Sequence, residues 1–151
     1  MDLSGKVALV TGGSSGLGRH FAALLASKGT IVFAAGRREE ALADLRSQIE
    51  SAGGRCYPLV MDVTDAASVE RGFAQIAATA EAPLSIVVNN AGVAQTRAAI
   101  DVSLEDWQSV LAPNLTGAFL VARAAALPPA SPIASAAARR DWPLTPRARQ
   151  D

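Results

Sequence analysis

The segment that most constrains this chain is the glycine-rich stretch TGGSSGLG at residues 11–18. It follows an apolar run at residues 6–10 and precedes a run of helical character at residues 19–27. Glycine adopts positive φ and has no Cβ to block a ligand, so a glycine-rich turn between a strand and a helix can receive a phosphate group. Backbone N–H groups and the positive end of the helix dipole would face that anion. The spacing therefore predicts a site for a dinucleotide diphosphate, with a ligand-free turn as the alternative.

Apolar runs and helical periodicity alternate along the rest of the chain. Strands are expected at residues 6–11, 30–35, 55–61 and 84–89. Helices are expected at residues 17–28, 39–51, 66–78 and 103–120. With right-handed crossovers, this alternation predicts an α/β fold, a Rossmann-like doubly wound parallel sheet.

The expected order of the strands in the sheet is 3-2-1-4. Pro58 lies within the third strand and requires an edge position, since proline cannot donate to a strand ladder. This order places the switch point between the first and fourth strands, where sheets of this kind bind their ligands.

Local features predict how the first and last helices are built. Phe21, Leu24 and Leu25 share one face of the first helix, which is expected to pack on the sheet. Ser103 is expected to cap the N-terminus of the last helix. Pro113 lies inside that helix, where it removes one hydrogen bond and predicts a kink.

Composition narrows the classes of function. The chain has 151 residues, half of them hydrophobic, which suggests one domain with a real core. Its net charge is zero and it has no basic stripe, which argues against a nucleic acid partner. The longest apolar runs are shorter than a membrane span, and the N-terminus lacks the features of a signal peptide, so no membrane partner is expected.

The single cysteine, Cys56, excludes an internal disulfide and fits a reducing cytosol, so a cytoplasmic location is expected. It lies in the third strand beside Tyr57 and Pro58, where a buried structural thiol is favoured over a nucleophile. No metal site is expected.

The chain changes character at residues 127–151, which hold five of the eight prolines and none of the twelve glycines. This predicts a dinucleotide-binding domain at residues 1–126 and an irregular tail rich in proline, alanine and arginine. The bias of the tail suggests a GC-rich gene read out of frame. A linker and a partner-binding arm are the alternatives.

Four motifs fall in order at the ends of successive elements. They are TGGSSGLG at residues 11–18, Asp62-Val63 after the third strand, NNAG at residues 89–92, and Asn114 in the helix that follows. With these motifs, residues 3–126 resemble the N-terminal portion of the short-chain dehydrogenase/reductase family. The resemblance implies an NAD(P)-dependent oxidoreductase that transfers hydride between the cofactor and an alcohol or ketone. The cofactor-binding residues that it implies are Gly12, Ser14, Ser15, Gly16, Leu17, Gly18, Arg37, Arg38, Asp62, Val63, Asn90, Ala91 and Gly92.

The resemblance also implies individual roles. Asp62 would accept a hydrogen bond from the adenine amino group, and Val63 would pack near the adenine ring. Residues 90–92 would line the floor under the cofactor ribose, while Asn89 would brace the neighbouring strand. The alternatives are a turn-forming Asp62 at a strand end and a plain turn at residues 90–92.

The end of the second strand bears on the choice of cofactor. An acidic side chain there would bond the ribose hydroxyls of NAD, but this chain has Gly36 followed by Arg37 and Arg38. Arginine offers a forked, permanently charged partner for a phosphate. We therefore predict a preference for NADP(H), with Arg37 as the main contact and NAD(H) still possible. The alternative is a solvated arginine pair beside Glu39 and Glu40.

The catalytic set of the family is a serine, a tyrosine, a lysine four residues after the tyrosine, and an asparagine. Only Asn114 has a counterpart here, and the resemblance implies that it supports a proton-relay water. The sole tyrosine is Tyr57, and residue 61 is methionine rather than lysine. We therefore expect an oxidoreductase by family that has no turnover as this chain alone. The alternatives are an inactive dinucleotide-binding module and a non-functional truncated or frameshifted remnant.

The expected partners are a nicotinamide dinucleotide and a small-molecule substrate that the sequence does not identify. The resemblance implies that the family buries one apolar face of the last helix in its subunit interface, the face of Val110, Leu111, Leu115 and Phe119. We expect that face to be bare here and the family-type homo-oligomer interface to be incomplete. The fourth strand is expected to form an unpaired edge.

Overall fold

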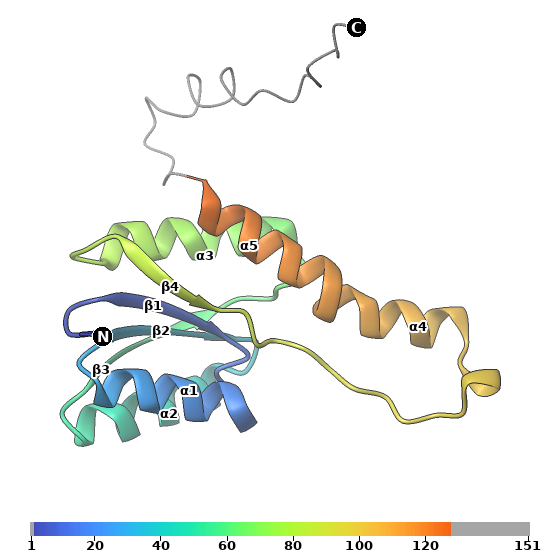
Figure 1. Cartoon of the computed structure of the whole chain (residues 1–151), viewed down its shortest axis with the longest axis horizontal. Coiled ribbons are helices and arrows are strands. Elements are labelled where there is room, and N and C mark those ends of the chain that lie inside the picture. The colour runs from blue at the N-terminus through green and yellow to red at the C-terminus, as the bar shows by residue number, and fades with distance from the viewer. Residues whose placement is uncertain (1, 128–151) are drawn as a thin grey trace, which may run out of the picture.

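Four parallel strands form one sheet in the order β3-β2-β1-β4, in a computed structural model that describes residues 2–127 (Figure 1). The strands are β1 (Val7–Thr11), β2 (Ile31–Gly36), β3 (Arg55–Val60) and β4 (Leu84–Val88). The predicted fold class and strand order are both confirmed. Pro58 lies in the edge strand β3, as its missing N–H requires. The tail expected at residues 127–151 lies outside the described residues, apart from Leu127.

Helices cover both faces of the sheet (Figure 1). One face carries α1 (Gly16–Ser27) and α2 (Glu39–Ser51), and the other carries α3 (Ala66–Thr79) and α5 (Ala118–Ala126). A long connection after β4 contains the short 3-10 helix η1 (Ala99–Asp101) and leads into α4 (Leu104–Leu111). The π-helical segment η2 (Ala112–Gly117) joins α4 to α5, so these helices form one long helical arm; α5 packs on the sheet and α4 projects beyond it.

The core divides into two layers, one on each side of the sheet. All five residues of β1 are buried, as expected for a central parallel strand. Phe33 of β2 stacks on Tyr57 of β3 with ring centroids 5.0 Å apart, and this pair belongs to the layer under α3 and α5. Cys56 belongs to the opposite layer, as a buried free thiol. The prediction of a buried structural cysteine is therefore confirmed.

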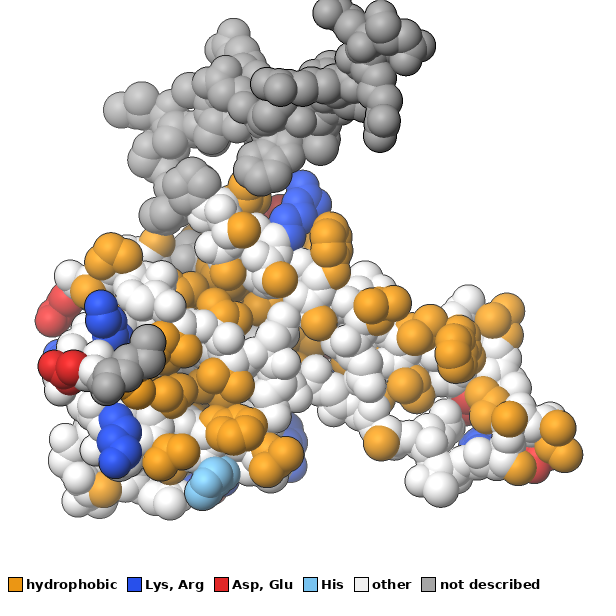
Figure 2. Space-filling model, viewed as in Figure 1, with side chains coloured by type: hydrophobic (Ala, Val, Ile, Leu, Met, Phe, Trp, Pro, Cys, Tyr) orange, Lys and Arg blue, Asp and Glu red, His pale blue; other side chains and the backbone are white. Residues whose placement is uncertain are grey.

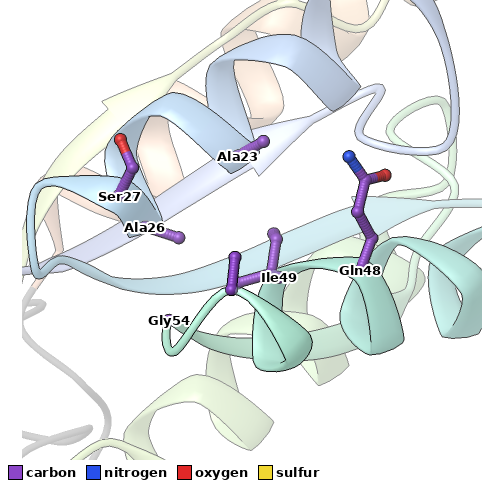
Figure 3. A pocket seen from close by; sticks show the side chains of 7 residues that line it. Ala23, Ala26, Ser27, Gln48, Ile49 and Gly54 are labelled. Carbon is purple, nitrogen blue, oxygen red and sulfur yellow. The ribbon is translucent and has the colours of Figure 1, made fainter.

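The buried face of α1 differs from the prediction. Its buried residues are Gly18, Ala22 and Ala26, whereas Leu24 is 48% exposed. Small side chains bring α1 close to the sheet and to α2, while the predicted Phe21 and Leu25 pack partly buried at the border of this core layer. A shallow groove remains between the two helices (Figure 3). Its lining residues are Ala23, Ala26, Ser27, Gln48, Ile49, Ala52 and Gly54.

The last helix also differs from the prediction. It extends to Ala126 rather than residue 120, and Pro113 lies within η2. The wider π turn accommodates a residue that has no N–H to donate and whose ring would clash with the preceding turn. Ser103 caps α4 as predicted, by accepting a hydrogen bond from the backbone N–H of Asp106 at 3.0 Å.

The continuous helical stretch Leu104–Ala126 is 23 residues long with a mean hydropathy of 1.2, so by length and composition it could cross a membrane. No such stretch was expected, because the apolar runs in the sequence are each shorter than a membrane span. Mostly buried core helices of water-soluble proteins meet the same criteria; here 11% of the stretch is buried, at its α5 end, where Leu120, Val121 and Ala124 pack into the core beside α3.

The fold makes a prediction about the reactivity of Cys56. Burial raises the pKa of its thiol from 9.0 to about 11. Because of the higher pKa, the thiolate fraction of Cys56 at pH 8 is about a hundredfold lower in the folded chain than in the unfolded chain. The rate of reaction with a thiol reagent follows the thiolate fraction. Native protein should react with a thiol reagent at least that much more slowly than protein in denaturant.

The same shift predicts how stability depends on pH. A raised pKa means that the contribution of the thiol is fully present below pH 9 and is lost as the pH rises toward 11. The free energy of unfolding of the wild type should therefore fall more steeply over this range than that of Cys56→Ala. Parallel pH profiles, or equal labelling rates with and without denaturant, would contradict this account.

Candidate functional site

The hydroxyl of Thr11, at the carboxyl end of β1, joins β1 to the turn that follows β4. Thr11 is fully buried, and its Oγ1 accepts hydrogen bonds from the backbone N–H groups of Asn90 and Ala91, both at 3.0 Å. Its proton is directed toward the carbonyl of Val88 at 3.5 Å and Oδ1 of Asn89 at 3.4 Å. One side chain thus fixes the NNAG turn beside the glycine-rich turn.

Two glycines allow these turns to lie in contact. The Asn90 side chain donates to the carbonyl of Thr11 at 3.0 Å and thereby lies over Gly12, which has φ of +69°. A Cβ on Gly12 would lie 2.8 Å from Nδ2 of Asn90. A Cβ on Gly18 would lie only 2.2 Å from the carbonyl oxygen of Gly12. Close packing requires glycine at both positions, and the positive φ of Gly12 requires it there as well.

Helix α1 begins at the glycine-rich turn with its first N–H groups uncapped. Ser15 is the N-cap residue, but among the described residues no side chain caps α1, and its first turn holds no acidic residue. The first turns of α2 and α4 contain acidic residues, and α3 is capped by Asp65. Gly16, with φ of +53°, has open space where its Cβ would be. The N-terminus of α1 is therefore suited to an anion.

Arg38 and Ser14 meet between the glycine-rich turn and the end of β2. Nη2 of Arg38 donates to the backbone carbonyl and to Oγ of Ser14, both at 3.3 Å. A Cβ on Gly36 would lie 3.3 Å from the same Oγ, so these three residues are close neighbours. It is Arg38, rather than Arg37, that contacts the turn.

Asp62, at the end of β3, folds into a tight local turn. Its Oδ1 accepts hydrogen bonds from the backbone N–H of Thr64 at 2.9 Å and from the Thr64 hydroxyl at 2.7 Å. These two bonds, with a smaller contribution from the charge of Arg37, lower the pKa of Asp62. Asp62 thus forms a turn at the end of the strand, which was the alternative to an adenine contact. It engages Oδ1 and does not exclude adenine at Oδ2, so the adenine contact stays a prediction.

Val63 and Asn89 both brace the arm. Val63 is buried, and a Cβ on Gly117 would lie 2.8 Å from its Cγ2. Nδ2 of Asn89 donates to the carbonyl of Ala118 at 2.7 Å. Asn89 therefore links β4 to α5, and it also accepts the hydrogen bond from Thr11 of the neighbouring strand β1, where a link was expected.

Asn114 lies in η2 and pairs with the backbone of Val93. Its Oδ1 accepts from the Val93 N–H at 2.8 Å, and its Nδ2 donates to the Val93 carbonyl at 2.9 Å. A Cβ on Gly92 would lie 2.9 Å from Oδ1 of Asn114. Asn114 thus holds the chain just after the NNAG turn. Nothing in the sequence pattern indicated Val93 as its partner.

A second anchor that the sequence did not reveal lies at the start of α4. The carboxylate of Asp106 accepts from the side chains of Gln95 at 2.9 Å, Arg97 at 2.7 Å and Ser103 at 2.9 Å. The hydrogen bonds from Gln95 and Ser103 are the main reasons why the pKa of Asp106 is lowered. Asp106 and Asn114 together hold both ends of the connection between β4 and α4.

The predicted residues thus gather at one edge of the sheet. The glycine-rich turn, residues 90–92 and Asn114 meet at the carboxyl ends of β1 and β4, while Arg38 and Asp62 follow β2 and β3 along the same edge. Within residues 2–127 there is no cluster of side chains suited to a metal ion.

Comparison with known proteins identifies the family. The short chain dehydrogenase family model matches residues 6–129. The chain belongs to this family. It is 42% identical over 122 residues to D-threitol dehydrogenase of Mycolicibacterium smegmatis, a match that covers 81% of this chain and 46% of that protein. It is 37% identical over 125 residues to gluconate 5-dehydrogenase of Gluconobacter oxydans, covering 83% of this chain and 48% of that protein.

Solved structures of short-chain dehydrogenases agree with the fold. A short-chain type dehydrogenase/reductase from Mycobacterium marinum superposes with a TM-score of 0.79 and 38% identity, covering 82% of this chain and 48% of that chain. A putative short-chain alcohol dehydrogenase from Sinorhizobium meliloti superposes with a TM-score of 0.75 and 41% identity, covering 82% of this chain and 49% of that chain. The family resemblance is therefore confirmed. The chain spans about half the length of the curated relatives it matches.

The geometry of this short-chain dehydrogenase chain predicts the effect of removing the Thr11 hydroxyl. Thr11→Ala leaves two part-buried backbone N–H groups without their partner and removes the contact to Oδ1 of Asn89, and an unsatisfied buried donor costs about 1–3 kcal/mol. We expect the free energy of unfolding to fall by about 2–4 kcal/mol, measured by urea denaturation.

Thr11→Ser is the matched control, because it keeps the hydroxyl and removes one methyl group, which costs about 1 kcal/mol. Equal destabilisation by the alanine and serine variants would show that the hydroxyl contributes nothing to the junction.

Proposed function

We propose that this chain is the dinucleotide-binding portion of an NADP(H)-dependent alcohol/ketone oxidoreductase and that it binds the cofactor without turning it over alone. The observation that carries this proposal is the junction at Thr11, where the NNAG turn packs on the glycine-rich turn. That junction leaves the uncapped N-terminus of α1 facing outward at the switch point of the sheet. Family membership supports a nicotinamide cofactor.

The diphosphate would lie at the start of α1. Backbone N–H groups of residues 16–18 and the helix dipole stabilise negative charge there, and the hydroxyls of Ser14 and Ser15 offer further donors. Leu17 is 67% exposed and is free to cover an apolar part of the cofactor. Residues 90–92 would line the ribose floor, because Thr11 and Asn114 hold them at the same edge.

The preference for NADP(H) rests on the charges after β2. Arg38 is held beside Ser14, Arg37 follows the same strand, and Gly36 stands where an acidic residue would repel a phosphate. A charge-assisted hydrogen bond contributes about 1.5–3 kcal/mol, or roughly ten- to a hundredfold in affinity. Asp62 and Val63 would accommodate the adenine at the next strand along.

Hydride transfer is proposed only for a protein that joins this portion to a serine, a tyrosine and a lysine. When bound, the nicotinamide supplies or accepts the hydride. Tyr57 stacks on Phe33 in the core and is not placed for proton transfer, and the Asn114 amide is engaged by Val93. The relatives named above act on D-threitol and gluconate, which are alcohols, so an alcohol/ketone pair is the substrate class that we propose.

Calorimetric titration with NADPH and with NADH tests the proposal. We expect NADPH to bind ten- to a hundredfold more tightly than NADH, through the charge-assisted bonds to the arginines. Arg37→Gln and Arg38→Gln should weaken NADPH binding while leaving NADH binding nearly unchanged. Arg46→Gln is the matched control, because Arg46 lies on the exposed side of α2, paired with Glu50 at 2.7 Å.

Equal or tighter binding of NADH would contradict the NADP(H) preference. Failure of the folded chain to bind either nucleotide would contradict the binding role and favour a non-functional remnant. Oxidation of NADPH in the presence of ketones, followed by absorbance, should not exceed the rate without protein. Measurable turnover would contradict the proposal that this chain alone does not turn the cofactor over.

A further inference from the structure

Arg19 follows directly on the glycine-rich turn and carries a positive charge near the N-terminus of α1. The helix dipole disfavours a cation at that end, and the first turn of α1 has no acidic residue to balance the charge. Within residues 2–127 no carboxylate lies within ion-pair distance of Arg19, Arg37 or Arg38. Figure 2 shows basic but no acidic side chains at the end of the body where α1 begins. An arginine in this place therefore has a reason other than the stability of its own helix.

The guanidinium of Arg19 crosses from α1 to α2. Its Nη1 donates to the backbone carbonyl of Ala41 at 3.2 Å, and its Nη2 donates to Oε1 of Gln48 at 2.9 Å. Gln48 extends from α2 beside α1 (Figure 3). Ala41 belongs to the first turn of α2, so Arg19 ties the starts of the two helices together.

A second arginine crosses the same gap in the opposite direction. Arg38 is the N-cap residue of α2, and its Nη2 donates to the carbonyl and to Oγ of Ser14, which precedes α1. The start of each helix is thus bonded to the start of the other by an arginine. We call the contacts of Arg19 with Ala41 and Gln48, and of Arg38 with Ser14, the arginine clasp.

The arginine clasp controls the placement of Arg37. Arg37 is exposed after β2, immediately before the N-cap residue of α2, so the position of its guanidinium depends on where α2 begins. Strand pairing fixes β2 only as far as Gly36. Beyond Gly36, the clasp and the buried Leu42 hold the start of α2 relative to the glycine-rich turn.

We propose that Arg19 is a positioning residue that sets the discrimination of this chain for a 2′-phosphate. It holds Arg37 and Arg38 where they meet the 2′-phosphate of a nucleotide whose diphosphate lies at the start of α1, and it contacts no part of the nucleotide. NADPH binds both helix starts at once, so its affinity depends on their relative placement, whereas the affinity of NADH depends on the start of α1 alone. The inference rests on the NADP(H) binding proposed above.

A structural role and an electrostatic role of Arg19 would have different effects. A tie that only stabilises the two helices would affect the binding of both nucleotides equally. The charge of Arg19 alone would attract the extra phosphate of NADPH whether or not Arg37 and Arg38 are present. A positioning role lowers the affinity for NADPH alone, and only while those two arginines are present.

Calorimetric titration of Arg19→Met with NADPH and with NADH tests the inference. Methionine keeps much of the aliphatic stem and removes the guanidinium. We expect NADPH to bind about two- to tenfold more weakly, because Arg37 and Arg38 must then be ordered on binding, while NADH binding is unchanged. In a chain that already carries Arg37→Gln and Arg38→Gln, adding Arg19→Met should have no further effect on either affinity.

Two further variants separate position from charge and from the general stability of α2. Arg19→Lys keeps the charge, but one ammonium does not reproduce the two-point contact with Ala41 and Gln48. Its preference for NADPH should therefore lie between those of the wild type and Arg19→Met. Arg46→Met is the matched control, because Arg46 pairs with Glu50 on the exposed side of α2, and its replacement should change neither affinity.

Amide hydrogen exchange without nucleotide tests the placement of α2 independently of cofactor binding. The N–H of Leu42 bonds the Arg38 carbonyl at 3.2 Å in the first turn of α2. In Arg19→Met this N–H should exchange faster. The N–H of Val69, which bonds the Asp65 carbonyl at 3.0 Å in the first turn of α3, should exchange at the same rate as in the wild type.

The wild type and the variants test different claims. A wild type without preference for NADPH would overturn the proposed function and, with it, the role of Arg19. Where the wild type prefers NADPH, that function stands, and the role of Arg19 is overturned by an undiminished preference in Arg19→Met or Arg19→Lys, or by an equal loss of NADH binding. A full effect of Arg19→Met in the chain without Arg37 and Arg38 would also overturn it. Unchanged exchange at Leu42 in Arg19→Met would overturn it whichever nucleotide the chain prefers.

Discussion

The hydroxyl of Thr11 is the contact on which the arrangement of the site depends. It accepts hydrogen bonds from two backbone N–H groups of the NNAG turn, and Thr11 is fully buried at the end of β1. Through it, the NNAG turn is held against the glycine-rich turn from which α1 begins. The glycines at positions 12 and 18 are a consequence, because any Cβ there would force the two turns apart. A buried donor without a partner is costly, so this junction is strongly specified.

The same edge is connected to the arm by amide side chains. Asn89 bonds the carbonyl of Ala118, and Asn114 bonds both backbone groups of Val93. The π-helical segment accommodates Pro113 and lets Asn114 lie opposite Val93. The connection between β4 and α4 is thereby held at one end by Asn114 and at the other by Asp106, although it contains little regular structure.

The strands, their order and the glycine-rich turn could be predicted because each depends on local or topological rules. Alternation of strands and helices fixes a parallel sheet, and Pro58 fixes its edge. The inward face of α1 could be predicted only in part: Phe21 and Leu25 do pack against the core, but Ala22 and Ala26 take its centre and Leu24 does not, although hydrophobicity alone ranks leucine above alanine. The contacts of Asn114, Asp106 and Arg38 join loops that are distant in sequence, and no periodic pattern records such contacts.

The central claim is that the carboxyl end of β1 and β4 receives the diphosphate of a nicotinamide dinucleotide. Backbone amide chemical shifts of the labelled chain, recorded by NMR during addition of NADPH, test it most directly. The account predicts that the largest changes fall on residues 16–18 and 90–92, with little change in the groove between α1 and α2. Changes confined to that groove, or none in a folded chain, would contradict it.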